Sequence, residues 1–581
     1  MNTTSAAATV EPTRQGLDAL SWPHAELRLG GPAGVAHRDA LVCIARGRPD
    51  FGDTGAAGSD DAERWLDLFA QHGEAAPERV RGRFGLAIVD TARRTVFAAT
   101  DRFATESWCH ATRNGRLLLS DRADLIGDGA RVAPEAIYSY LFHHVIPAPL
   151  TIFEDVARLE GGHRLRWADG EVAVAPWWRP AFREPDRIDF AEARERFLEL
   201  VRQAVARAAG RGRVGSFLSG GTDSSTVAGM LCQVGGAPAE TYSIGFDASG
   251  YDEMEYARIA SRHFGTHHHE YYVTPEDLLE GIPLVARHYD QPFGNSSAVP
   301  AWLCARLAAG DGIETLLAGD GGDELFGGNA RYAKQRVFGW YDHLPEPLRG
   351  GLLERLLDQP SVARLPLFSK AASYARQARI GLPGRLHQYN LVVMLGADQI
   401  LEPDFLHTVD LQAPHYAHEE VWSRIDANDD LNRMLAFDMK FTLADNDLPK
   451  VLGTTAMAGL GVEFPLLDDA LLDFSLGLPC SYKLKGFRLR WFFKEALRDF
   501  LPAEIITKKK HGFGLPFGVW ACQHAGLRSL AGDTLASFRQ RGIVQPAFVD
   551  RLLNELLPAH PGYYGELVWI LLMLELWLEG H

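Results

Sequence analysis

The chain has 581 residues, enough for at least two domains that each bury a core. Its composition, 46% hydrophobic and 23% charged, is typical of a soluble globular protein, and its formal net charge of -16 argues against nucleic acid or an anionic membrane as a partner. The six cysteines are scattered without a Cys-x-x-Cys pair, which argues against a disulfide framework or a zinc site and favours the cytoplasm.

The N-terminal third has the pattern of short β-strands. Apolar runs at residues 41–44, 84–89, 95–99 and 116–119 are separated by polar or glycine-containing turns. We expect a sandwich of two sheets. The polar, proline-containing segment 183–187 predicts the linker to the next domain.

Three segments of this region carry a family resemblance: residues 82–90 (Gly-Arg-Phe-Gly-Leu-Ala-Ile-Val-Asp), 101–103 (Asp-Arg-Phe) and 119–121 (Leu-Ser-Asp). They resemble the glutamine amidotransferase domain, of the Ntn-hydrolase type, at the front of asparagine synthetases. The resemblance implies a nucleophilic cysteine directly after the initiator methionine, with its free α-amine as base. This chain has Asn2 there, and its first cysteine is Cys43.

Other parts of that glutaminase pattern are altered as well. The family's Asn-Gly substrate loop appears as Ala45-Arg46-Gly47. Cys43 and Cys109 lie in apolar or aromatic settings, which favours packed cysteines over replacement nucleophiles. We therefore predict that residues 1–182 form a degenerate amidotransferase-like β-sandwich domain that does not hydrolyse glutamine.

From residue 213 to residue 319, β-like and helix-like segments alternate. Strands are expected at 214–218, 241–246, 268–273 and 313–318, with helices at 225–234, 252–264, 275–289 and 298–309. Such alternation predicts a doubly wound parallel sheet with ligands at the carboxyl ends of its strands. The chain beyond residue 331 is mostly helical in pattern. The predicted class is α/β, with a second domain at 190–581 that has a helical C-terminal part.

A polar loop at residues 217–225 (Phe-Leu-Ser-Gly-Gly-Thr-Asp-Ser-Ser) follows the first of these strands and opens a helix. Helix N-termini attract anions, and glycines let a phosphate approach the backbone. Asp223 suits such a place only with a divalent cation beside the phosphate. The loop predicts a pyrophosphate site with a built-in metal ligand; a plain Gly/Ser turn is the alternative.

The Ser-Gly-Gly-x-Asp-Ser motif resembles the pyrophosphate loop of ATP pyrophosphatases, which cut ATP between its α and β phosphates. A second loop, residues 319–328 (Gly-Asp-Gly-Gly-Asp-Glu-Leu-Phe-Gly-Gly), resembles the matching segment of asparagine synthetases. Both loops follow strands and should meet at one mouth, where Asp223 and Asp323 would share a magnesium ion. The resemblance implies that Asp320 is the proton acceptor near the incoming amine.

The predicted nucleotide-binding residues are Leu218, Ser219, Gly220, Gly221, Asp223, Ser224, Ser225, Ile244 and Gly319. Residues 501–516 resemble the family's lysine segment, which implies that Lys510 stabilises charge on the adenylate. Lys508 and Lys509 are interpreted as solvated. Residues 450–468 match their family counterpart poorly, and the arginine that would hold a carboxylate is missing, so aspartate is in doubt as substrate.

Together these patterns predict a ligase that uses ATP and Mg²⁺ to adenylate a carboxylate, releases pyrophosphate and transfers the acyl group to an amine without hydrolysing glutamine. The resemblance extends to β-lactam synthetases and lasso-peptide cyclases, which favours an organic amine and a specialised pathway. The alternatives are a peptide macrocyclase, an asparagine synthetase that uses free ammonia, and a non-catalytic ATP-binding scaffold. Small molecules or peptides would be the substrates, and a homodimer is left open.

Overall fold

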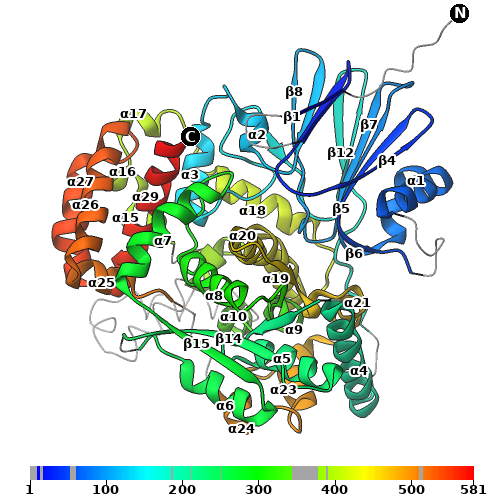
Figure 1. The fold of residues 1–581 in the computed structure, drawn as a ribbon. Helices are drawn as coiled ribbons and strands as arrows, with labels where there is room; N and C mark the ends of the chain where they lie inside the picture. The colour runs from blue at the N-terminus through cyan, green and yellow to red at the C-terminus, as the bar shows by residue number, and fades with distance from the viewer. Residues whose placement is uncertain are drawn as a thin grey trace, which may run out of the picture.

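The computed structural model describes residues 9–12, 18–52, 60–184, 188–210, 212–248, 250–342, 377–387, 390–508 and 514–581. The chain has an α/β fold in which an N-terminal β-sandwich adjoins a five-stranded parallel sheet and a helical C-terminal part (Figure 1). The predicted fold class is confirmed.

Two six-stranded sheets form the sandwich, in the orders β1-β2-β3-β9-β8-β10 and β12-β11-β7-β6-β5-β4. Leu27, Ile44 and Leu119 are fully buried in the apolar core that the two sheets share. The predicted strands fall within β5, β6, β7 and β9. The strands are β1 (Thr9–Pro12), β2 (Asp18–Ser21), β3 (Ala25–Leu29), β4 (Gly34–Arg38), β5 (Leu41–Asp50), β6 (Arg81–Asp90), β7 (Thr95–Thr100), β8 (Cys109–Arg113), β9 (Arg116–Ser120), β10 (Ala157–Arg158), β11 (His163–Ala168) and β12 (Glu171–Pro176).

Among the described residues of this part, three helices and one 3₁₀ turn accompany the sandwich. They are α1 (Asp61–His72), η1 (Gly73–Arg79), α2 (Asp124–Gly127) and α3 (Pro134–His143). Trp65 of α1 packs against Phe84 of β6, with ring centroids 5.0 Å apart, and thereby covers the outer face of the second sheet.

The parallel sheet has the order β15-β14-β13-β16-β17. The order reverses at β13, so its switch point lies between β13 and β16, where ligands of such sheets bind. Apolar clusters cover both faces, one of them built on α4, α5 and α6 and the other on α8. The elements are α4 (Phe190–Ala209), β13 (Val214–Phe217), α5 (Thr222–Gly235), β14 (Glu240–Phe246), α6 (Met254–Phe264), β15 (His267–Val273), α7 (Pro275–His288), α8 (Ala298–Gly310), β16 (Thr315–Leu317) and β17 (Gly461–Glu463).

Most of the described chain after residue 321 is helical, as predicted. No helix of the described residues is long and apolar enough to cross a membrane. The elements are α9 (Gly322–Phe326), α10 (Ala330–Asp342), η3 (Gly384–His387), α15 (Leu391–Leu395), α16 (Ala397–Ile400), α17 (Pro403–Leu406), α18 (Ala413–Arg424), α19 (Asp430–Asp438), η4 (Met439–Asp447), α20 (Leu448–Met457), η5 (Pro465–Leu467), α21 (Asp469–Leu476), α22 (Cys480–Lys483), β18 (Leu484–Lys485), β19 (Arg488–Leu489), α23 (Trp491–Ala496), α24 (Ala503–Thr507), α25 (Phe517–Gln523), α26 (Ala525–Phe538), η6 (Arg539–Arg541), α27 (Pro546–Arg551), η7 (Leu552–Leu556), α28 (Leu557–Ala559) and α29 (Pro561–Gly580).

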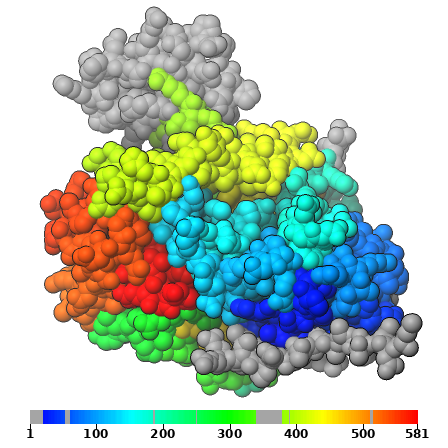
Figure 2. Space-filling view, turned by 90° about the horizontal axis from the view of Figure 1, so that it is seen from above, coloured from blue at the N-terminus to red at the C-terminus, as the bar shows by residue number. Residues whose placement is uncertain are grey.

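The N-terminal and C-terminal parts share one hydrophobic core. Helix α3 packs in the same apolar cluster as α7 and α29, and the Tyr140 hydroxyl donates a hydrogen bond of 2.9 Å to the Ile570 carbonyl. Figure 2 shows the cyan segment around α3 between the blue sandwich, the yellow helices and the red C-terminal helix. The domain boundary between 182 and 190 stays a prediction, and residues 185–187 of the expected linker lie outside the described residues.

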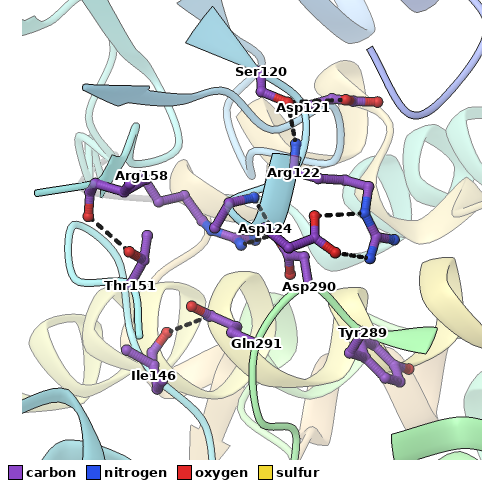
Figure 3. A network of polar contacts seen from close by, with 12 residues as sticks. Ser120, Asp121, Arg122, Asp124, Ile146, Thr151, Arg158, Tyr289, Asp290 and Gln291 are labelled. Atoms are coloured by element: carbon purple, nitrogen blue, oxygen red, sulfur yellow. Dashed lines mark hydrogen bonds and ion pairs between the residues drawn. The ribbon is translucent and has the colours of Figure 1, made fainter. Parts of the chain in front are cut away.

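A buried ion-pair network joins the two parts at Asp290, just after α7 (Figure 3). Its carboxylate forms an ion pair with Arg158 at 2.5 Å and accepts a hydrogen bond of 2.7 Å from the Ala123 amide. Both of these residues belong to the N-terminal part of the chain. Arg122 donates to the His288 carbonyl at 3.1 Å. Burial alone would raise the pKa of the Asp290 carboxyl, but Arg158 and Arg122 hold it below its ordinary value.

We expect Asp290→Asn to lower the free energy of unfolding by about 3 kcal/mol, because it leaves Arg158 buried without its partner. The midpoint of urea unfolding, followed by tryptophan fluorescence, measures the loss. Asp155→Asn, at an exposed position, is the control and should unfold like the wild type.

The pH dependence of this loss follows from the lowered pKa of Asp290. Its ion pair contributes above the unfolded-state pKa of about 4 and is lost as the pH falls through the lower folded-state value. The difference between Asp290→Asn and wild type should therefore shrink in acid. A difference that stays constant down to low pH would contradict this account of the pair.

Candidate active site

The two acidic loops face each other across the switch point of the parallel sheet. One follows β13 and enters α5, and the other follows β16 and enters α9. Gly319 permits their contact, because a Cβ atom there would lie only 2.7 Å from the Ser224 amide nitrogen. Helix α5 begins at Thr222 instead of residue 225, so Asp223 and Ser224 lie in its first turn.

Both loops line one cavity of about 450 Å³. Within the first loop, the Ser219 amide donates to Ser224 Oγ at 3.1 Å, and the two hydroxyls lie 2.9 Å apart. The predicted site residues that line the cavity are Leu218, Ser219, Asp223, Ser224, Ile244, Gly319, Asp320 and Asp323. Eight of the twelve predicted site residues therefore line one cavity.

Gly220, Gly221 and Ser225 are not among the lining residues. Gly220 has a φ of 67°, and a Cβ atom there would lie 2.4 Å from the Ala257 nitrogen of α6. Residue 220 must therefore be glycine so that α6 can approach the loop, whether or not a phosphate also binds there. Ser225 is fully buried within α5. Nucleotide binding by these three residues stays a prediction.

One part of the cavity wall gathers acidic groups around a lysine. Lys450 donates to Asp447 Oδ1 at 2.9 Å; burial alone would lower the pKa of Lys450, but Asp447 and Asp320 raise it, so it is a cation. Burial, helped by Asp447 and opposed by Lys450, raises the pKa of Asp320 to about 6. Burial likewise raises the pKa of the Glu324 carboxyl to about 8. Asp320 is thus ionised near neutral pH yet basic enough to accept a proton.

The Asp223 and Asp323 carboxylates contact the same cation, the guanidinium of Arg490. Its Nη1 atom lies 2.8 Å from Asp223 Oδ2 and 3.1 Å from Asp323 Oδ1. Two carboxylates that reach one cation fit the role predicted for them, because Mg²⁺ takes carboxylate oxygens. The sequence analysis missed Arg490, which is 267 residues from Asp223 in the chain and belongs to none of the motifs.

The interpretation of Lys508 as a solvated residue is wrong. Its ammonium lies 3.0 Å from Glu253 Oε2 and 3.4 Å from the Gly220 carbonyl, and its side chain is only 8% exposed. A long lysine stem can be buried while the charge finds a partner, and here it holds the first loop against α6. Lys509 and Lys510 lie outside the described residues, so the role of Lys510 stays a prediction.

When residues 461–468 are matched to the family segment, Glu463 stands at the position of the missing arginine, and it faces the sandwich instead of the cavity. Glu463, at the end of β17, lies 3.3 Å from Arg48 Nη1 and 3.4 Å from Arg83 Nη1. These three side chains line a second cavity of about 550 Å³ between the two parts of the protein. Leu467 also lines it and packs against Gly321, which lines the first cavity.

The two cysteines considered as replacement nucleophiles are fully buried. Burial raises the pKa of the Cys109 thiol to about 12 and moves that of Cys43 higher still, so neither forms a thiolate near neutral pH. Arg46, in the place of the substrate loop, lies 3.1 Å from Asp121 and 3.4 Å from Glu106. An ion-pair cluster thus fills that part of the sandwich.

Comparison with known proteins gives two family matches. A model described as asparagine synthase matches residues 196–579, and one described as glutamine amidotransferase domain matches residues 52–178. A putative asparagine synthetase [glutamine-hydrolyzing] of Mycobacterium bovis is 27% identical over 536 residues, which is 89% of this chain and 79% of that protein. Asparagine synthetase [glutamine-hydrolyzing] 1 of Bacillus subtilis is 24% identical over 79% of this chain and 72% of its own.

A relative with a different name is Amidase chyE of Penicillium rubens, 25% identical over 80% of this chain and 74% of its own. Together with two acidic loops at the switch point of a parallel sheet, these matches define a carbon–nitrogen ligase of the AMP-forming type. The chain belongs to the asparagine synthase family, since that model covers more than half of it.

We expect Gly319→Ala to weaken ATP binding, because its Cβ atom must push the second loop away from α5. Overpacking of this kind costs about 1–3 kcal/mol, or roughly 5- to 150-fold in affinity if it falls on the bound state. Equilibrium dialysis with labelled ATP measures the loss. Gly310→Ala is the matched control, since nothing lies within 4 Å of a Cβ atom there, and equal affinities in the two variants would refute the expectation.

Proposed function

We propose that this ligase adenylates a carboxylic acid and passes the acyl group to an amine without hydrolysing glutamine, in a specialised pathway. A carboxylate oxygen attacks the α-phosphorus of ATP, the bond to the β-phosphate breaks, and pyrophosphate leaves. The amine then attacks the acyl carbon, loses a proton, and AMP departs. The single observation that carries the proposal is the meeting of two acidic loops at one cavity.

Each step has residues placed to assist it. Ser219, Ser224 and the first turn of α5 would hold pyrophosphate, because hydroxyls and unpaired helix N–H groups donate to anions. Asp223 and Asp323 would hold Mg²⁺, which neutralises charge on the phosphates when bound. Asp320 would accept the proton of the amine, and Lys510 would stabilise negative charge at the acyl adenylate.

The charges of the cavity support an amine as the second substrate. Besides the two carboxylates assigned to the metal, Asp320 and Asp447 line it together with Lys450, while the raised pKa of Glu324 keeps that acid mostly protonated near neutral pH. More acids than bases remain, which favours a group that arrives as a cation. Lys450 is the lining cation that could meet the substrate carboxylate. Glu463, turned toward the sandwich, cannot replace the missing arginine fork and argues against aspartate.

The absence of a glutaminase step is supported by the sandwich itself. Within the described residues, its candidate cysteines are buried with raised pKa values, and Arg46 fills the place of the substrate loop. Ammonia or an organic amine must then come from solution. The six free cysteines also support a reducing, cytoplasmic setting.

The test is ATP–pyrophosphate exchange with a panel of small acids and peptides, followed by product analysis with glutamine, ammonium or organic amines. We expect exchange with a small acid and amide formation with an organic amine but not with glutamine. Asp323→Asn should abolish exchange and serves as the inactive control. Exchange with peptides alone would indicate a macrocyclase. A product that forms only with glutamine would contradict the claim that the N-terminal β-sandwich does not hydrolyse glutamine. The absence of exchange with every acid would favour a non-catalytic scaffold.

Asp320→Asn should separate the two half-reactions. Loss of a general base slows amide formation by about 100-fold or more, whereas pyrophosphate exchange, which precedes the proton transfer, should keep its rate. In the wild type, the rate of amide formation should rise through pH 6 as Asp320 loses its proton, and this rise should vanish in the variant. A variant that keeps the same pH profile would exclude Asp320 as the base.

A further inference from the structure

Arg490 is held in an unusual position beside the two carboxylates. It follows β19 directly and has a φ of 56°, a region that arginine seldom adopts. It is 6% exposed, and its guanidinium lies 4.4 Å from the centre of the Phe493 ring. Surroundings that keep a residue in such a conformation often serve a function.

The guanidinium bridges the two loops. Besides Asp323 and one oxygen of Asp223, it contacts the second oxygen of Asp223 through Nη2, and Nη1 lies 3.0 Å from the Thr222 hydroxyl. Two carboxylates this close, at most 22% exposed, would repel each other strongly without a cation. Arg490 therefore stabilises the contact of the loops in the nucleotide-free protein.

The protein alone offers few ligands for a metal at this place. Among the residues that the structure describes, no group of three or more His, Cys, Asp or Glu side chains could hold a metal ion. Mg²⁺ needs about six oxygens, so with Asp223 and Asp323 as its protein ligands, phosphate oxygens and water must supply the rest. Before the nucleotide arrives, the arginine and a metal ion compete for the same two carboxylates.

We propose that Arg490 is the resident counter-ion of Asp223 and Asp323, which it releases to the metal only when the metal arrives with ATP. This inference rests on the metal assignment of the proposed function. It makes Arg490 a positioning residue that keeps free divalent ions out of the site and keeps the loops together until MgATP binds. Metal binding is thereby coupled to nucleotide binding.

The test uses Mn²⁺ as the probe and electron paramagnetic resonance to count free ions, with the full chain and no nucleotide. We expect weak binding by the wild type and binding about tenfold tighter by Arg490→Gln, because the two carboxylates lose the charge that competed with the ion. Arg490→Lys should fall between them, since an ammonium offers no planar fork to bridge both acids. Arg498→Gln, an exposed arginine paired with Glu495, should match the wild type.

Mn²⁺ affinity that does not rise in either Arg490 variant would overturn the proposal. If Arg490→Gln folds only when Mn²⁺ is present, the ion has replaced the guanidinium and the proposal stands. A separate measurement tests the underlying assignment: Mn²⁺ binding in the presence of ATP, compared between wild type and Asp323→Asn. Equal binding there would refute the metal site itself, whatever the Arg490 variants do.

Discussion

The structure depends on the close contact of two strand-end loops that both carry negative charge. The contact requires that residue 319 lack a side chain, because the chain after β16 passes over the first turn of α5 at van der Waals distance. It also requires a positive charge, because Asp223 and Asp323 both enter the space between the loops. The Arg490 guanidinium supplies that charge and contacts both carboxylates. Sterics and electrostatics thus act together to form one cavity from two distant segments.

The surrounding architecture fixes the positions of these loops. Helix α3, which belongs to the N-terminal part in sequence, is buried in the same apolar cluster as α7 and α29. Asp290 ties the turn after α7 to Arg158 and to the Ala123 amide. The turn after Asp290 leads to Asn295 and Ser297, which line the cavity between the two loops. The N-terminal part therefore supports one wall of the site. This structural role does not require the N-terminal domain to catalyse a reaction.

The sequence could predict the parallel sheet and the meeting of the loops, because alternating strands and helices place successive strand ends on one edge. It could not predict Arg490, which reaches the site from a turn after β19, far along the chain and outside every motif. It also could not predict the burial of Lys508, although that residue lies in the recognised lysine segment. The run at 508–510 is uniformly basic, and only packing against Glu253 and the Tyr256 ring distinguishes Lys508 from a solvated lysine. The sequence analysis also did not predict the shared core, because a local pattern in residues 134–143 cannot show that α3 packs against α7 and α29.

The charges around the cavity describe a resting state. Each of the three cations that the structure places at the loops or the cavity wall is already paired: Lys450 with Asp447, Arg490 with Asp223 and Asp323, and Lys508 with Glu253. ATP in this cavity would bring several negative charges beside four aspartates and one lysine, with Glu324 mostly protonated near neutral pH, so the bare nucleotide would be repelled. In the proposed function, a divalent ion bound to its phosphates would reduce that repulsion and would give Asp223 and Asp323 a stronger partner than a guanidinium. On that proposal, the ordinary ion pairs of the resting site would favour binding of the metal–nucleotide complex over binding of either component alone.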